Sequence, residues 1–528
     1  MTPSVSSFAN VDPDAIGKGY IVRHLLHGEW IDPDFPVEIA DPLHGGTLCR
    51  VDQAQPAQFY GFADQLGDCP TYGRHNPLYN VGRYTMLGEV FRKVGNALLD
   101  PDVADFFARL IQRCMPKSLA QCHGEVKVTA LGFVNFSGDN VRFMARSFGV
   151  SGDHNGQESR GYRWPFGPVM IIAPFNFPLE IPALQLLGAL AMGNLPLLKC
   201  DPRVAIVMEQ FIRLLIACGL PREDVILMHA DGVTTQQFVE QNAKLIRLLQ
   251  FTGSSRIYEL LAKIMGGRIK GEDAGFDWKI LGPDFHPNWL PYVAWQSDQD
   301  AYAASGQKCS AQSVVFAHRN WLDGGLVVEL AHRAALRKLD DLTIGPVLTW
   351  TTEDMLDHIA ALLRIPGAKL LFGGRALTGH TIPVFYGAIE PTAVQVPLAA
   401  FANDEFFRRI TTEVFGPLYV AVEWDDGDLE TVLGIFESLD QRLTAAVVSR
   451  DQVFINEVLG RTNNGTTYAG IRARTTGAPQ NHFFGPAGDP RAAGIGTPEA
   501  IRDTWSGHRE LIHDVGPLPV GWTLPDPT

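Results

Sequence analysis

A regular alternation of short apolar runs with helix-period segments, which begins near residue 168, constrains the fold most strongly. Strands are expected at residues 169–173, 195–200, 225–228 and 245–251, and helices at 179–192, 206–218 and 235–244. Another amphipathic helix is expected after residue 255, with Ile257, Leu260, Leu261 and Ile264 on one face. Strands that alternate with helices form βαβ units and a parallel sheet. The pattern therefore predicts a doubly wound sheet of the nucleotide-binding type.

A second α/β set follows in the chain. It comprises expected strands at 313–317, 369–372 and 444–449 and an expected helix at 326–336. A chain of 528 residues exceeds the size that one hydrophobic core supports, so more than one domain is expected. The polar, glycine-rich stretch 147–164 lies between apolar segments and is interpreted as a hairpin arm that leaves the body.

Composition excludes two classes of partner. The net charge is −14 and no run is rich in Lys or Arg, so nucleic-acid binding is not expected. The uncharged stretch 181–198 approaches the length of a membrane span, but two prolines and two glycines interrupt it. A buried helix that runs into a buried strand is the better interpretation, and no membrane association is expected.

The seven cysteines are odd in number, scattered, and never spaced as C-x-x-C. This usage indicates a reducing compartment and predicts neither structural zinc nor another metal site. The first twenty residues contain no apolar secretory core and no Arg-rich amphipathic stretch, so we expect no targeting peptide in this chain.

Three short motifs could carry chemistry, and each also has an ordinary structural interpretation. Cys309 follows Gly306-Gln307-Lys308, a setting that suits a thiolate nucleophile, although a lone cysteine is more often a buried small hydrophobe. Gly253 and Ser254 lie between an expected strand and helix, where the helix dipole favours a pyrophosphate, although a plain N-cap is as good an explanation. Asn176 is flanked by aromatics and prolines and could stabilise an oxyanion or merely form a turn.

Two carboxylates and one lysine complete the set. Glu272 and Glu413 each lie near glycine, and each taken alone is more readily a solvated or capping acid. Lys199 is expected at a strand end. No G-x-G-x-x-G follows an expected strand, so a dinucleotide site of the usual Rossmann fingerprint type is not supported.

Taken in chain order, Asn176, Lys199, Gly253 with Ser254, Glu272, Cys309 and Glu413 resemble the motif series of the aldehyde dehydrogenase superfamily. The resemblance implies an α/β aldehyde dehydrogenase fold with a Rossmann-like NAD-binding domain (1–146 and 165–276) and an α/β catalytic domain (277–502). It also implies a β-hairpin oligomerisation arm (147–164 and 503–528) and hence a homo-oligomer of at least two chains.

The sequence is more closely similar to the plant-type Δ1-pyrroline-5-carboxylate dehydrogenase subgroup, from about residue 27 to 524. The segments that carry this similarity include GYRWPFGPV, PFNFPLEIP, EDAGFDWKILGPD and DQDAYAASGQKCSAQS. The resemblance implies NAD-dependent oxidation of L-glutamate γ-semialdehyde to L-glutamate in proline degradation, through a cysteine-bound intermediate. It further implies the mitochondrial matrix in a eukaryote and the cytoplasm otherwise.

The same resemblance implies a role for each site residue. Cys309 is the expected nucleophile, Asn176 the oxyanion donor and Glu272 the general base. The residues expected to bind the cofactor are Lys199, Gly253, Ser254, Glu413 and Phe415. The residues expected to bind the aldehyde substrate are Phe177, Ser310, Gly477, Ala478 and Phe484.

Three departures from the superfamily pattern leave alternatives open. Asp273 follows Glu272 directly and competes for the role of base, although Glu272 is favoured. Pro202 stands where an acid often contacts the adenosine ribose, so NADP⁺ is not excluded beside NAD⁺. The loop around Phe484 leaves that assignment open by one residue.

Three other functions are compatible with parts of the sequence. A dehydrogenase of another ω-semialdehyde would share the fold and nucleophile and differ only in loop residues. A thiol hydrolase pairing Cys309 with a histidine such as His482 would need no nucleotide. A non-catalytic structural protein would have no reason to keep Cys309, Glu272 and Asn176 together.

Overall fold

The computed structural model of the chain describes residues 3–477 and 482–528. Its first large sheet has the strand order β12-β11-β8-β9-β10-β2-β3, and the first five of these strands run parallel. Their bounds are β8 Pro168–Ile172, β9 Leu195–Lys199, β10 Ile226–Leu227, β11 Leu248–Thr252 and β12 Ile269–Glu272, with β2 Leu25–Leu26 and β3 Glu29–Trp30 added antiparallel at one edge. This is the doubly wound sheet that the apolar alternation predicted.

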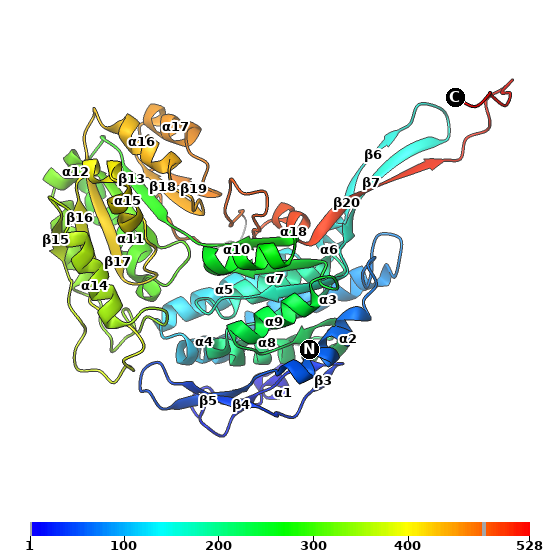
Figure 1. Cartoon of the computed structure of the whole chain (residues 1–528), viewed down its shortest axis with the longest axis horizontal. Helices are drawn as coiled ribbons and strands as arrows, with labels where there is room; N and C mark the ends of the chain where they lie inside the picture. The colour runs from blue at the N-terminus through cyan, green and yellow to red at the C-terminus, as the bar shows by residue number, and fades with distance from the viewer. Residues whose placement is uncertain (1–2, 478–481) are drawn as a thin grey trace.

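Helices cover both faces of this sheet because alternate residues of each strand point to opposite sides. Val169 and Ile171 of β8 join the core formed with α3, α4, α5, α7 and α8, whereas Met170 and Ile172 join the core formed with α2, α9 and α10. The bounds are α2 Phe59–Gly67, α3 Gly82–Leu98, α4 Pro101–Cys114, α5 Leu119–Asn135, α7 Glu180–Ala191, α8 Ala205–Ala217, α9 Gly232–Asn242 and α10 Ser255–Ile264. Figure 1 shows these helices stacked in layers in the lower half of the molecule.

A second seven-stranded sheet has the order β15-β16-β17-β14-β13-β18-β19 and is parallel except for β15. Its strands are β13 Asp277–Leu281, β14 Gln312–His318, β15 Lys369–Phe372, β16 Thr392–Val396, β17 Leu418–Trp424, β18 Thr444–Val448 and β19 Thr466–Ala469. The helices around it are α11 Leu290–Tyr302, α12 Arg319–Asp323, α13 Leu326–Ala334, α14 Thr352–Leu363, α15 Asp404–Ile410, α16 Leu429–Glu437 and α17 Gln452–Gly460. Because β13 begins five residues after β12 ends, the two sheets are joined by a short segment.

A three-stranded antiparallel arm projects from the body (Figure 1). It consists of β6 Arg146–Ser151, β7 Gln157–Pro165 and β20 Ser506–Asp514, with β7 in the centre. The hairpin expected at 147–164 is therefore present, and a strand from the C-terminal end of the chain extends it. Arg163 ties the arm to α18 Pro498–Trp505, since its guanidinium donates to the carbonyls of Arg502 and Ser506 at 2.6 and 2.8 Å.

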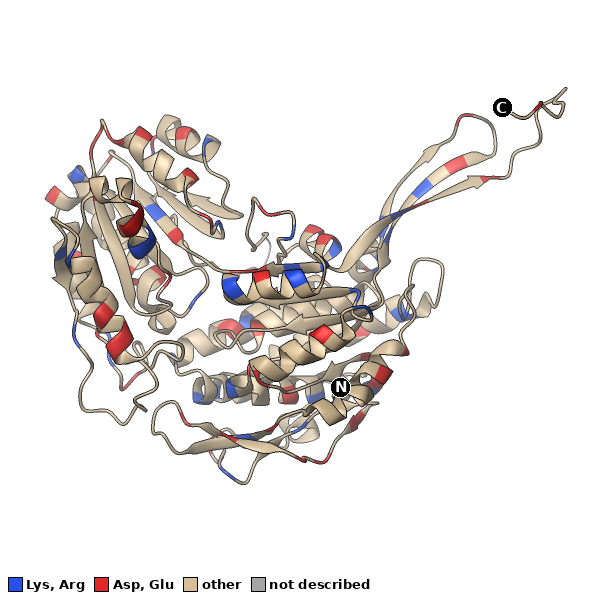
Figure 2. Cartoon of the chain, viewed as in Figure 1, with Lys and Arg blue, Asp and Glu red and all other residues tan. Residues whose placement is uncertain are grey.

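Smaller elements complete the described chain. They are α1 Val5–Phe8, α6 Asn140–Met144 and the sheet β1-β5-β4, with bounds β1 Ile21–Val22, β4 Pro36–Ala40 and β5 Thr47–Asp52. Figure 2 shows acidic and basic positions interspersed along the ribbon, in agreement with a sequence that has no basic run.

The expected elements are present in the structure, and the largest boundary shifts are three residues. The helix expected at 235–244 begins earlier, as α9 Gly232–Asn242. The strand expected from residue 245 begins at Leu248, because the amides of Leu245 and Ile246 bond back to the carbonyl of Asn242 in the turn that ends α9. The apolar stretch 181–198 is α7 followed by β9, and no described helix is long and apolar enough to cross a membrane. All seven cysteines are free thiols, and six of them are buried.

Candidate active site

The candidate site residues gather at the carboxyl ends of the parallel strands of the first sheet, the edge where open α/β sheets bind ligands. Asn176 follows β8, Lys199 ends β9, Gly253 follows β11 and Glu272 ends β12. The strand pairing fixes Glu272 opposite Thr252, and the amide of Gly253 donates to the carbonyl of Glu272 at 3.1 Å. Sheet register alone thus brings residues about a hundred positions apart to one edge.

Cys309 approaches this edge from the second sheet, on the loop between α11 and β14. The backbone before it is left-handed at three consecutive positions: Ala304, Ser305 and Gly306 have φ values of 55°, 56° and 70°. A Cβ at Gly306 would lie 2.1 Å from the carbonyl oxygen of Gly416, so only glycine allows this close approach. The turn presents Cys309 toward the first sheet.

Side chains of this loop lock the turn to residues 345–348, a segment to which the sequence analysis gave no role. The amide of Gly345 donates to Ser305 Oγ at 2.7 Å, and Ser305 Oγ lies 3.1 Å from the Gly345 carbonyl. Gln307 is buried, donates to the carbonyl of Pro346 at 2.9 Å, and accepts from the amide of Leu348 at 2.8 Å. The nucleophile loop is therefore held in place before any ligand binds.

Glu272 lies next to the Cys309 thiol. Its side chain is only 7% exposed, and Oε1 has no hydrogen-bond partner among the described residues. Burial raises the pKa of Glu272 to about 7, although the neighbouring thiol pulls it down. Burial and the negative charge of Glu272 raise the pKa of the Cys309 thiol well above its usual value. Asp273, the alternative base, is less buried, and its backbone carbonyl accepts from Ser255 Oγ.

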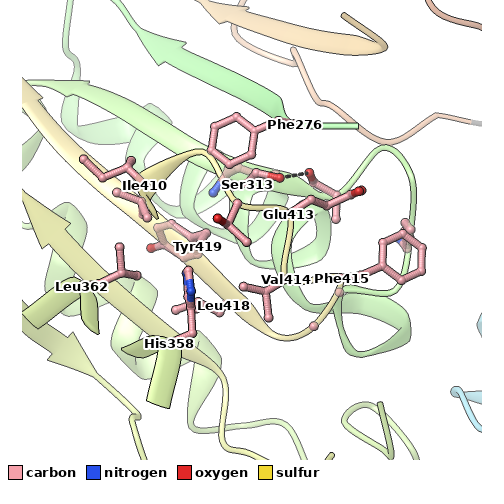
Figure 3. Close-up of a pocket in the computed structure, with 17 residues that line it drawn as sticks. Phe276, Ser313, His358, Leu362, Ile410, Glu413, Val414, Phe415, Leu418 and Tyr419 are labelled. Carbon is pink, nitrogen blue, oxygen red and sulfur yellow. Dashed lines mark hydrogen bonds between the residues drawn. The ribbon is translucent and has the colours of Figure 1, made fainter. Parts of the chain in front are cut away.

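Glu413 is the third acid of this cluster. Its Oε1 accepts from the amide of Gly275 at 3.3 Å, and burial with the nearby charge of Glu272 raises its pKa to about 8. It lines a cavity of about 20 Å³ in which Figure 3 shows Glu413 and Tyr419 directed inward and Phe415 turned away. Phe415 has a left-handed φ of 52° and packs edge-on against Phe175.

The nucleotide end of the site has free donors. Ser254 is the N-cap of α10 but makes no side-chain cap bond, so the first amides of the helix can face an anion. Lys199 is buried at the end of β9, and desolvation lowers its pKa. Pro202 stands where an acid often contacts the adenosine ribose. The neighbouring Asp201 is not free to make that contact, because Arg203 binds both of its carboxylate oxygens at 2.9 and 2.7 Å.

A pocket of about 300 Å³ opens above the thiol. Phe177, Ser310, Gly477 and Phe484, all expected substrate residues, line it together with Cys309. Phe484 is 5% exposed and bridges to Ile495, which favours Phe484 over Phe483 for the open assignment. Ala478, the remaining expected substrate residue, lies outside the described residues.

A family model described as the aldehyde dehydrogenase family matches residues 88–489. The chain belongs to the aldehyde dehydrogenase family. Two plant proteins match it over nearly the whole length: a "Probable aldehyde dehydrogenase" of Linum usitatissimum at 55% identity, and "Delta-1-pyrroline-5-carboxylate dehydrogenase 12A1, mitochondrial" of Arabidopsis thaliana at 54%. Each alignment covers 99% of this chain and 94% of the relative. An NAD-dependent aldehyde dehydrogenase from Sinorhizobium meliloti superposes with a TM-score of 0.82 at 18% identity, covering 99% of both chains, which confirms the fold.

Membership of this family excludes two of the alternative functions, the thiol hydrolase and the non-catalytic structural protein. The His482 ring bonds the Tyr468 hydroxyl at 2.8 Å, so the histidine named for a hydrolase is engaged there. A second group of functional residues, the charged side chains that hold the site loops, carries no motif in the sequence that indicates this role.

Lys117 and Glu125 form the first of these ion pairs and lie directly beneath the Asn176 loop of the dehydrogenase. Both side chains are fully buried, with Nζ and Oε2 2.6 Å apart. Lys117 also donates to the Asn176 carbonyl at 3.1 Å and lies 4.5 Å from the centroid of the Phe177 ring. The other oxygen of Glu125 accepts from the amides of Leu179 and Glu180 at 2.8 and 3.1 Å. Lys117 lies in the segment between α4 and α5, and Glu125 lies on the buried face of α5. The sequence offered no specific signal for the pair.

The second pair, Lys279 and Asp300, holds the loop on the opposite side of the pocket. Nζ and Oδ2 are 2.7 Å apart, and both side chains are buried. Asp300 also accepts from the amide of Thr475 at 3.0 Å and from the hydroxyl of Thr476 at 2.8 Å. Gly477 follows immediately, so this pair fixes one wall of the pocket to β13.

Replacing Lys117 with Met is expected to destabilise the enzyme by about 3–5 kcal/mol, because Glu125 would keep a buried charge without its partner. The free energy of unfolding in urea measures this effect. Lys127→Met is the matched control, since Lys127 is exposed on the same helix, α5, and should change stability by no more than about 0.5 kcal/mol. A Lys117→Met enzyme as stable as Lys127→Met would show that the pair is not needed.

Proposed function

We propose that this aldehyde dehydrogenase oxidises L-glutamate γ-semialdehyde, the open form of Δ1-pyrroline-5-carboxylate, to L-glutamate with NAD⁺ in proline degradation. The observation that carries the proposal is a cysteine thiol beside a buried carboxyl at the base of a pocket of about 300 Å³. The name of the Arabidopsis relative, at 54% identity over nearly the full length, supports the choice of substrate. A dehydrogenase of another ω-semialdehyde is the alternative.

The described residues suit a dinucleotide. The uncapped N-terminus of α10 after Gly253 and Ser254 would receive the pyrophosphate, and Lys199 would bond the adenosine ribose. Glu413 would accept from the nicotinamide ribose, and Phe415 would pack near the nicotinamide. When bound, NAD⁺ supplies a hydride acceptor. Two solved structures of this fold are complexes with NAD. One is a betaine aldehyde dehydrogenase from Staphylococcus aureus, and the other is named as a methylmalonate-semialdehyde dehydrogenase from Sinorhizobium meliloti.

The residues of the chain divide the oxidation into two easier steps. Cys309, as a thiolate, bonds to the aldehyde carbon, and the oxygen becomes an oxyanion that the Asn176 amide and the Cys309 amide N–H stabilise. Loss of hydride from that carbon leaves a thioester on Cys309. Glu272 then takes a proton from a water as it attacks the thioester, and the carboxylic acid and the thiolate separate. Phe177 and Phe484 would pack on the aliphatic part, while Ser310 and the amide of Gly477 would anchor the α-carboxylate.

We also propose that the arm joins two copies of the chain into a homo-oligomer. Within the described parts of the chain, the outer strands β6 and β20 each have one edge that pairs with no other strand. Phe148, Val150 and Ile512 on these strands are 76, 55 and 67% exposed. In this organisation residues 1–146 and 165–276 bind the cofactor, residues 277–502 carry the nucleophile, and residues 147–164 and 503–528 form the arm. In a eukaryote the proposed compartment is the mitochondrial matrix, and in a bacterium the cytoplasm.

The test is reduction of NAD⁺, and separately of NADP⁺, followed at the nicotinamide absorbance with three aldehydes. We expect the highest kcat/KM with Δ1-pyrroline-5-carboxylate, and lower values with succinate semialdehyde and a simple aliphatic aldehyde. A higher kcat/KM for another ω-semialdehyde would overturn the substrate and keep the class of reaction.

A further inference from the structure

Glu180 is a carboxyl in the substrate pocket that the mechanism does not use. It lies in the first turn of α7, is 8% exposed, and lines the pocket with Phe177, Cys309 and Ser310. Among the residues that the structure describes, the backbone amide of Glu180 is hydrogen-bonded, but its side chain has neither a hydrogen bond nor an ion pair. The remaining eleven residues of α7 are buried and contain no other charge. The Glu180 carboxyl is therefore available to a ligand that enters the pocket.

The neighbouring Glu125 cannot serve the same purpose because its oxygens are occupied. One accepts from two backbone amides and the other from Lys117. Glu180 therefore has free acceptor capacity in this wall of the pocket, whereas Glu125 has none to spare. Burial and the charge of Glu125 raise the pKa of Glu180 to about 8, against the opposing effects of Lys117 and Lys308. A cation placed beside Glu180 would relieve the cost of ionising it.

A cation lines the same pocket with no carboxylate partner. Arg474 lies 4.8 Å from the centroid of the Tyr468 ring, and no carboxylate of the described residues is within ion-pair distance of it. It sits two residues before Thr476, on the loop that Asp300 holds. Lys308 also lines the pocket, and neither it nor Arg474 forms an ion pair among the described residues. The pocket thus combines one carboxyl with available acceptors and positive charge beside it, the arrangement that suits a zwitterion.

We propose that Glu180 binds the α-ammonium group of the substrate while Arg474 supplies positive charge for its α-carboxylate, so that the pocket selects an α-amino acid aldehyde over a plain ω-oxo acid. The inference rests on the proposed function and adds the residue that recognises the amino group. Glu180 thereby acts on substrate selection and not on the reacting atoms.

The test compares L-glutamate γ-semialdehyde with glutarate semialdehyde, which has the same carbon chain and lacks the ammonium group. We expect the wild type to prefer the amino acid aldehyde and Glu180→Gln to lower the ratio of the two kcat/KM values by about 10- to 100-fold, chiefly through KM. Glu180→Asp should recover part of the ratio, which a merely structural role would not predict. Glu353→Gln, which removes an exposed charge from α14, is the control and should leave the ratio unchanged.

Arg474→Met provides an independent test in case Glu180→Gln does not fold. It should lower kcat/KM for both carboxylate-bearing aldehydes relative to pentanal, whereas Arg472→Met should not, because Arg472 is exposed and contacts Tyr292. A folded Glu180→Gln enzyme that keeps the wild-type ratio overturns this inference alone. A wild type that oxidises glutarate semialdehyde but not L-glutamate γ-semialdehyde overturns the proposed function and the inference with it.

Discussion

Cys309→Ala is expected to lower aldehyde oxidation by about four orders of magnitude or more, because removal of a covalent nucleophile abolishes both halves of the reaction. The fold should survive, since the turn before the cysteine is held by Ser305 and Gln307 and not by the thiol. Steady-state reduction of NAD⁺ measures the loss, and intrinsic fluorescence of the bound and free enzyme reports whether the cofactor still binds.

The matched control is Cys218→Ala. Cys218 is a buried thiol at the end of α8, remote in the fold from the strand ends that carry the site, so this variant should keep its turnover. Substantial NAD⁺ reduction by Cys309→Ala would exclude the thiol as the nucleophile. Equal losses in both cysteine variants would indicate damage to the fold.

Glu272→Gln is expected to lower steady-state turnover by about 10²- to 10⁴-fold, the range typical for loss of a general base. The first turnover should be affected less than the later ones, so that the acyl group accumulates on Cys309. Stopped-flow absorbance gives the size of the burst, and mass spectrometry of the quenched enzyme detects the acylated chain.

Asp273→Asn separates the two candidate bases. Because the Asp273 carboxyl is held by Ser255 and Glu272 is the acid next to Cys309, the substitution should leave the thioester hydrolysis intact. If Asp273→Asn stalls at the thioester while Glu272→Gln turns over, the assignment of the base is wrong by one residue.

The pH dependence of the hydrolysis step follows from the ionisation of Glu272. Only the carboxylate can accept a proton from water, and burial raises its pKa to about 7. Single-turnover hydrolysis of the thioester should therefore rise with pH, reach half of its maximum near pH 7 and level off above pH 8. In Glu272→Gln the slow residual rate should show no such inflection.

The sequence predicted most of the fold because its signals are local. Strand and helix periods identified β8, α7, β9 and α8 to within a few residues. The site residues at strand ends were also accessible, since Asn176, Glu272 and Cys309 each sit in a short motif. That the C-terminal segment joins the arm was implied by the family resemblance and not by any local pattern, because β20 pairs with β7 across more than 340 residues of chain.

The two buried ion pairs that hold the site loops could not be predicted from the sequence, for a physical reason. Lys117 contacts Asn176 across 59 positions, and Asp300 contacts Thr475 across 175. Neither partner carries a pattern that points to the other, and a single charged residue in apolar sequence resembles a helix boundary as much as a buried pair. Only the packing of α5 under the Asn176 loop, and of α11 beside the 475–477 loop, reveals their function.

The left-handed turn before Cys309 has a consequence for how this enzyme can change. Ala304 and Ser305 occupy a backbone region that costs side-chain-bearing residues of the order of 1–3 kcal/mol each, and glycine would remove most of that strain. Glycine would also widen the range of shapes open to the loop, and it would cost the Ser305 bond to Gly345. Glycine at these two positions would therefore relieve backbone strain but hold Cys309 less firmly. Selection for heat resistance and selection for turnover would favour different residues there, so that a more stable enzyme would be a slower one.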